Sequence, residues 1–285
     1  MRFVLTTLLW LVTTILLAVA VPAAWAQQNV VDEDGYARFA QDAAADPAVQ
    51  DAMAAELTTQ LVRLAGNSGY DVRTELLSAA ATGYTRSAAF PGQFALVNRV
   101  AHRWMFTDVV SQSDSSGRWL VDLGPMLADS SFQQTLRDYG IKAPSTLEVP
   151  LTEKAPDALR PGQLRQVGRF GPWVSVAAAV LAGVFALLTL AASRGRGKGL
   201  AALGVSALLV GAAGWAALEV GRRYLDNALN DTSADIRRLA EALITQAIGS
   251  VHQYLNLALA AGGVLVAFGV IVAMLGSVFR KQTGS

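Results

Sequence analysis

The sequence has no cysteine, only two histidines, and few charged residues, which make up 16% of its 285 positions. Without cysteine the chain has no disulfide, no thiol nucleophile and no cysteine ligand for a metal. A metal site needs several converging His or carboxylate ligands, whereas His102 and His252 lie in separate regions of the chain. We therefore expect a buried, hydrogen-bonded imidazole at His102 and predict no metal site.

Motifs of common enzyme chemistry are also missing. The chain has no Gly-x-Ser-x-Gly elbow, no phosphate-binding Walker loop and no dinucleotide fingerprint. Residues 66–69 and 114–117 have the composition of turns and no histidine close by in sequence. The acidic residues 32–34 lack the later ligands of a calcium loop and are better interpreted as the start of a helix. We predict no catalytic residue, no cofactor and no enzymatic activity.

What the sequence contains instead is long apolar runs. Hydrophobic residues make up 53% of the chain and the mean hydropathy is +0.36, as in a membrane protein with a polar part. Apolar runs cover residues 3–21, 173–192, 200–218 and 255–279. About 20 apolar residues of helix cross a bilayer core of ~30 Å. We predict a mainly α membrane protein with four transmembrane helices and a small α+β extracytoplasmic domain.

Basic residues predict how these helices cross the membrane. Residues 193–199 separate the two middle runs and carry three cations, and short loops rich in Lys and Arg stay cytoplasmic. Arg2 and residues 280–281 place both termini on the same side. Residues 27–170, with 17 acidic and 13 basic side chains, would then lie outside the plasma (inner) membrane. This acidic exported part argues against a nucleic-acid partner, which needs a basic face.

Residues 1–26 have two interpretations. Ala24-x-Ala26 resembles a signal-peptidase site, but the apolar run before it is longer than the usual 7–15 residues. It is also long enough to span a bilayer. We expect a retained N-terminal transmembrane anchor, with a cleaved signal peptide as the alternative.

The exported region, residues 27–156, is predicted to contain helices and two short strands. Helices are expected after Asp46-Pro47, after Asp71 with a stop at Gly83, and from Pro91. Alternating apolar residues predict strands near 119–123 and 147–151, with a helix at 126–139 between them. Residues 157–172 are interpreted as a linker into the transmembrane helix at 173–192.

The last third of the chain predicts two long helices. Helical spacing continues beyond the third apolar run, which indicates one helix over residues 200–230 and another over 234–279 that ends in the last span. We expect these two to form a helical hairpin rising above the membrane. An amphipathic segment lying on the outer leaflet is the alternative.

Glycines recur on the faces of two predicted spans at seven-residue spacing: Gly204 and Gly211, and Gly262, Gly269 and Gly276. Small residues at such spacing let helix backbones approach one another. Glycine is also simply common in transmembrane helices. We predict that these five residues serve helix packing, within the protein or against a partner.

Inside the last three spans the sequence has no acid, base or histidine. Transporters and proton pumps usually place ionisable groups near the middle of the membrane. This pattern favours a structural role for the spans.

Several stretches resemble a known family. They are residues 22–28 (PAAWAQQ), 90–108 (FPGQFALVNRVAHRWMFTD), 127–136 (LADSSFQQTL), 160–165 (RPGQLR) and 191–215 (AASRGRGKGLAALGVSALLVGAAGW). Together they resemble the lipid uptake coordinator B family of actinobacterial conserved membrane proteins, over most of the chain. The resemblance implies an accessory subunit of mammalian-cell-entry lipid importers, ABC systems that move fatty acids or sterols inward. It carries over no functional residue, since no stretch is a catalytic motif.

The leading hypothesis is a non-enzymatic accessory or scaffold subunit of a cell-envelope complex, with membrane lipid and integral membrane subunits as partners. An envelope enzyme with an ectodomain site is the second hypothesis. A small pore or lipid-binding protein, which would need a continuous cavity between spans, is the third.

Overall fold

The computed structural model describes residues 2–67, 73–107, 120–122, 133–134, 148–150, 162–193, 195–228 and 234–282. The chain divides into two compact units. The membrane unit comprises Met1–Gln27, Phe170–Leu225 and Ala247–Ser285. The helical unit comprises Gln28–Arg169 and Asp226–Gln246.

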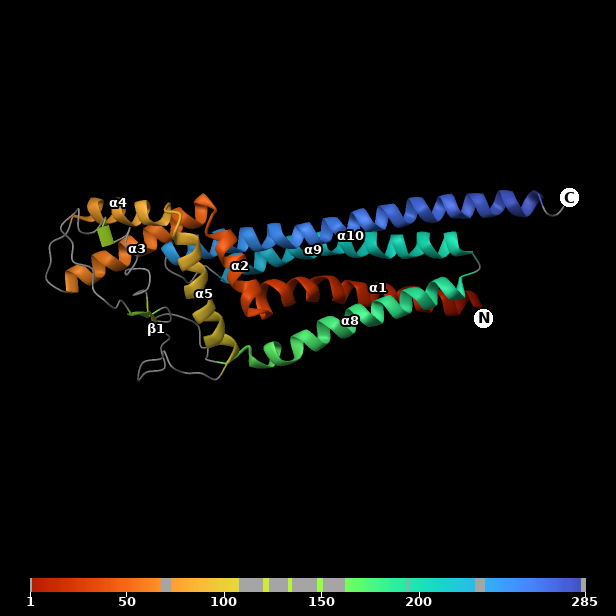
Figure 1. The fold of residues 1–285 in the computed structure, drawn as a ribbon, viewed down its shortest axis with the longest axis horizontal. Coiled ribbons are helices and arrows are strands. Elements are labelled where there is room, and N and C mark those ends of the chain that lie inside the picture. Colours follow the sequence, from red (N-terminus) through yellow and green to blue (C-terminus); the bar gives the residue numbers. More distant parts are fainter. Residues whose placement is uncertain are drawn as a thin grey trace. The chain divides into compact units, whose positions relative to one another are not determined.

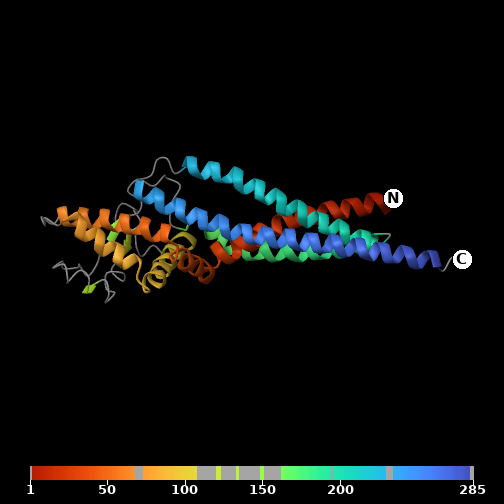
Figure 2. The same cartoon turned by 90° about the horizontal axis from the view of Figure 1, so that it is seen from above.

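Four long helices form the membrane unit (Figure 1): α1 (Arg2–Ala26), α8 (Arg165–Ala192), α9 (Arg196–Ala228) and α10 (Ala234–Gln282). Each contains a stretch long and apolar enough to cross a membrane, so the chain is a membrane protein. Large apolar side chains such as Val176, Leu187 and Phe268 are exposed on these helices, as expected of surfaces that face lipid. Figure 2 shows the same helices from above.

The helix bounds extend the predicted segments. α8 begins at Arg165, so the second half of the predicted linker is helical and the helix runs through Pro172. A proline inside a membrane helix is tolerated because neighbouring helices and local adjustments satisfy the freed carbonyl. α1 continues into a π-helical turn, η1 (Gln27–Val31), beyond the predicted signal-peptidase site.

Within the part of the helical unit that is described lie four shorter helices: α2 (Glu33–Ala43), α3 (Pro47–Asn67), α4 (Thr74–Thr85) and α5 (Phe90–Phe106). α3 begins where the sequence predicts, because the Asp46 carboxylate accepts a hydrogen bond of 2.8 Å from the Ala48 N–H. α4 runs past Gly83 to Thr85, so glycine does not stop it as expected. The Asp71 cap lies outside the described residues.

One hydrophobic core joins these helices. Phe90 and Leu77 are fully buried in it, together with Leu57, Tyr84 and other apolar side chains of α3, α4 and α5. The first turns of α10 also belong to this unit, since Leu239 and Leu243 pack against the core. The apolar face of this part of the predicted hairpin is therefore covered by the chain itself.

The strand predictions have a limited counterpart. β1 (Leu120–Asp122) pairs antiparallel with β2 (Glu148–Pro150), with Val121 opposite Val149. These three-residue segments lie where alternation predicts strands, but the part of the chain that is described is mainly helical and does not show an α+β domain. The predicted helix at 126–139 lies almost entirely outside the described residues.

Candidate functional site

In the membrane unit, α9 and α10 approach each other at backbone distance through glycine. A Cβ atom added at Gly204 would lie 2.6 Å from the carbonyl oxygen of Gly262. One added at Gly269 would lie 2.6 Å from the carbonyl oxygen of Gly197. No real side chain tolerates these distances to backbone atoms, so glycine is what lets the two helices touch.

The remaining predicted glycines differ in their surroundings. The nearest neighbour of Gly211 is a side chain, since an added Cβ would lie 2.6 Å from Leu259 Cγ and 3.3 Å from the Leu255 carbonyl oxygen. Gly276 lies within α10, and its surroundings are outside the described part. The sequence analysis placed Gly197 in the charged loop and did not predict it as a helix-packing residue. Its position seven residues before Gly204 was the signal that could have identified it. It also missed Gly214, whose added Cβ would lie 2.5 Å from Leu255 Cδ2.

Polar contacts join α1 to α8 and α9. The Trp10 indole N–H donates to the Ala202 carbonyl at 2.8 Å, and the Thr14 and Ser206 hydroxyls are 2.8 Å apart. Thr13 and Thr189, both fully buried, approach to 3.4 Å. Hydrogen bonds of this kind hold membrane helices together. The sequence did not reveal them, because these residues lie inside runs that read as apolar.

A cavity of about 690 Å³ opens where α1, α8 and α9 meet at the 193–199 turn. Its lining includes Phe3, Thr7, Trp10, Ser193, Lys198 and Ala202. Its volume falls within the range of small-molecule sites. Lys198 lies in the first turn of α9 and is the one charged side chain among the described residues of the lining.

A second cavity, of about 360 Å³, lies between α1, α9 and α10. Its lining is largely apolar and includes Trp25, Leu218, Tyr254 and Leu255. Nearby on the same helices, the Trp215 indole stacks on the His252 ring at 3.7 Å between centroids. Trp and Tyr gather at membrane–water interfaces, so this end of the unit has the chemistry of an interfacial belt.

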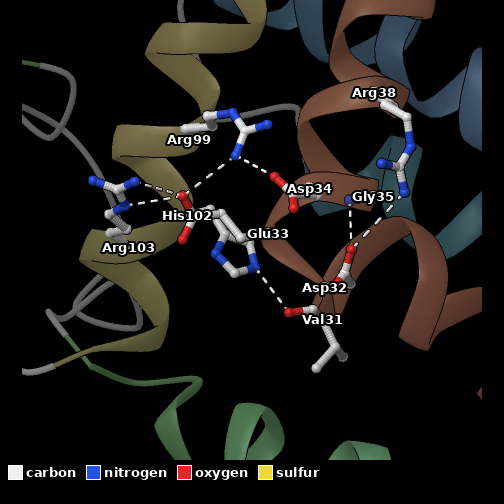
Figure 3. A network of polar contacts seen from close by, with 9 residues as sticks. All are labelled: Val31, Asp32, Glu33, Asp34, Gly35, Arg38, Arg99, His102 and Arg103. Atoms are coloured by element: carbon white, nitrogen blue, oxygen red, sulfur yellow. Dashed lines mark hydrogen bonds and ion pairs between the residues drawn. The ribbon is translucent and has the colours of Figure 1, made fainter.

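In the helical unit, acidic residues at the start of α2 pair with arginines of α5 (Figure 3). The Arg103 Nε and Nη2 atoms donate to Glu33 Oε1 at 2.9 and 2.8 Å, and Arg99 donates to Asp34 at 2.5 Å. Asp32 accepts from the Gly35 N–H at 2.7 Å and thereby caps α2. The acidic run is therefore a helix start, as predicted, and its first-turn carboxylates are held by cations from another helix.

These ion pairs change the proton affinities of their members. The hydrogen bond from Arg103 lowers the pKa of Glu33, and the hydrogen bond from Arg99 lowers the pKa of Asp34. The same Glu33 contact raises the pKa of Arg103. Each shift favours the charged form, so the cluster is an ion-paired network and not a poised acid or base.

His102 fastens α5 to the end of η1. Its ring is buried, and Nε2 lies 3.1 Å from both the Val30 and the Val31 carbonyl oxygens. Because carbonyl oxygens only accept, Nε2 carries the proton and donates to them. The His102 ring also stacks on the Phe106 ring, with 4.2 Å between the ring centroids. His102 is thus the buried, hydrogen-bonded imidazole that the sequence predicts.

Within the described ranges, no group of three or more His, Cys, Asp or Glu side chains could hold a metal ion. Residues 114–117 lie outside those ranges. Comparison of the chain with protein-family models, curated proteins and solved structures gave no match.

Proposed function

We propose that this chain is a non-enzymatic accessory or scaffold subunit of a cell-envelope membrane complex. The observation that supports this most is the contact of α9 and α10 at backbone distance through Gly197, Gly204, Gly262 and Gly269. Two helices packed this closely leave no space for a substrate to pass between them at the contact. Such packing is better suited to a surface that other subunits bind than to a transport path.

The helical unit supports the same proposal from outside the spans. Its α2 carboxylates are held by α5 arginines, and its buried histidine is held by backbone carbonyls. These groups fix the positions of helices. Such a rigid body, joined to membrane helices, is suited to holding the subunits of a complex in register.

The basic 193–199 segment supports placement of that turn and both termini in the cytoplasm, with residues 27–170 outside the plasma membrane. We propose residues 27–156 as an extracytoplasmic α+β domain. The paired segments β1 and β2 are the observation that favours a sheet there.

The resemblance to the lipid uptake coordinator B family points to a particular complex. We propose an actinobacterial lipid importer of the mammalian-cell-entry, ABC type, with integral membrane subunits and membrane lipid as partners. An envelope enzyme with an ectodomain site is the competing proposal.

Purification of the tagged full-length chain in mild detergent, with identification of copurifying proteins, tests the proposal. We expect integral membrane subunits of a transport complex to copurify with the wild type. Gly269→Leu should lose them, because a side chain there meets the backbone of α9. Gly263→Leu is the matched control, since nothing lies within 4 Å of its added Cβ. Normal assembly of Gly269→Leu, together with loss of activity from one ectodomain substitution in a folded protein, would favour the enzyme instead.

A further inference from the structure

The cavity at the 193–199 turn has a chemistry that the accessory role does not require. It lies within the membrane unit, at the ends of α1, α8 and α9. Its volume of about 690 Å³ is tens of times that needed for a water molecule and is suited to part of a larger ligand.

Charge in the cavity has one sign. Lys198 is exposed and lines it, and no acidic side chain occurs among the described lining residues. Lys198 also lies in the first turn of α9, where the helix dipole contributes further positive potential. The indole N–H of Trp10 is already used by the Ala202 carbonyl. The Lys198 ammonium is therefore the strongest donor in the lining, and it favours an anionic group.

The cavity also has a wall suited to hydrocarbon. Phe3, which lines it, is 82% exposed, and further apolar side chains of α1, Val4 and Leu8 among them, are exposed beside it. On a helix that crosses a membrane these surfaces face acyl chains. A ligand in the cavity would hence meet a cation at one end and lipid-facing apolar surface along its length.

We propose that this cavity binds an anionic phospholipid from the leaflet on the side of the 193–199 turn. The phosphate pairs with the Lys198 ammonium, and an acyl chain follows the surface formed by Phe3 and Trp10. The neighbouring sequence cations of residues 193–199 raise the local concentration of anionic lipid. This lipid-binding proposal does not rest on the proposed accessory role. Lipid binding and copurification of subunits are measured separately, so either proposal can fail without the other.

The test is native mass spectrometry of the delipidated full-length chain, titrated with dioleoyl-phosphatidylglycerol or dioleoyl-phosphatidylcholine. The wild type should bind phosphatidylglycerol more tightly. Lys198→Gln should weaken phosphatidylglycerol binding by roughly five-fold, the contribution of one lysine near anionic lipid, and leave phosphatidylcholine binding unchanged. Lys198→Arg should retain the preference. Arg222→Gln, which removes an exposed cation from the same helix outside this lining, should retain it as well.

A variant with an obstructed cavity and a competition experiment complete the test. Thr7→Trp, at an exposed position of the lining, places an indole in the cavity and should weaken binding of both lipids by obstructing it. Excess glycerol 1-phosphate should not displace phosphatidylglycerol, since it lacks acyl chains. The proposal is overturned if Lys198→Gln keeps the preference, if Arg222→Gln loses it equally, if Thr7→Trp binds as the wild type does, or if glycerol phosphate competes fully.

Discussion

Gly204 and Gly262 face each other reciprocally across α9 and α10. A Cβ at either residue would lie within 2.6–2.8 Å of the other's carbonyl oxygen. At Gly204 and Gly262 the backbones of α9 and α10 are therefore in direct contact. Where apolar lipid supplies no hydrophobic drive for association, such close van der Waals contact is what holds two spans together.

Replacement of one of these glycines should separate the helices. Gly262→Leu forces a side chain against Gly204 and Leu208, and we expect a loss of about 2–3 kcal/mol in stability, as for an overpacked core. Thermal unfolding in detergent measures this. Gly263→Leu, the next residue along α10, points to open space and should unfold like the wild type. Equal effects of the two substitutions would contradict the contact.

The N-terminal helix should be retained in the mature protein. Its contacts with Ala202 and Ser206 would be lost if the chain were cut after Ala26, and buried Thr189 would lose its neighbour Thr13. Intact-mass measurement of the purified protein decides the matter. A chain that begins at Gln27 would mean that the signal-peptide alternative is correct.

The proposed topology can be tested with single cysteines, because the chain has no thiol background. Gly195 is the suitable position in the basic turn, since nothing lies within 4 Å of its added Cβ, whereas Gly197 is closed off by α10. In spheroplasts an impermeant maleimide should label Ser78→Cys, at an exposed site on α4, and should label Gly195→Cys only after permeabilisation. Labelling of Gly195→Cys from outside would reverse the topology.

Acid should weaken the helical unit through Glu33. Its folded pKa is lowered, so its ion pair with Arg103 stabilises the fold above the unfolded pKa, and this contribution is lost as pH falls through the folded pKa. We expect the Tm to fall below about pH 4.5, and Glu33→Gln to flatten that fall. Glu75→Gln is the matched control, because Glu75 is an exposed acid in the first turn of α4. The same slope in wild type and Glu33→Gln would show that the pair contributes nothing.

Replacement of His102 should affect folding through its donated hydrogen bond. His102→Leu leaves the Val30 and Val31 carbonyls without this donor and should cost about 1–3 kcal/mol in stability. His102→Gln retains an N–H donor and should lose less. Denaturant unfolding of both variants compares them. If the Gln variant were no more stable than the Leu variant, stacking on Phe106 would be the main role of the ring.

The sequence predicted features whose signals are local. Apolar runs revealed the four spans, Asp46-Pro47 marked the start of α3, and seven-residue spacing identified Gly204, Gly262 and Gly269. Each depends on residues within a few helical turns of one another. That is the range over which side-chain periodicity and capping act.

Contacts between distant segments escaped prediction. Arg103 and Glu33 lie 70 positions apart, and no local pattern assigns one exposed arginine to one acid. The early start of α8 was missed because Pro161 and Gly162 read as a linker. Gly162 does turn the chain, with a φ of 70°, but the helix forms soon after it. Gly168 then packs against the Phe106 ring, a contact that only the fold supplies.

The contacts of Trp10 and Thr14 impose an order on how the protein is made. Their partners in α9 lie 192 positions later, which a ribosome needs roughly 10 to 40 s to synthesise. Meanwhile α1 stays in the bilayer with no partner from α9. The Thr7, Thr13 and Thr14 hydroxyls donate to carbonyls one turn back in their own helix, so they are satisfied during that interval. Because these three threonines are already hydrogen-bonded within α1, their hydroxyls need no partner from another helix before α9 is made.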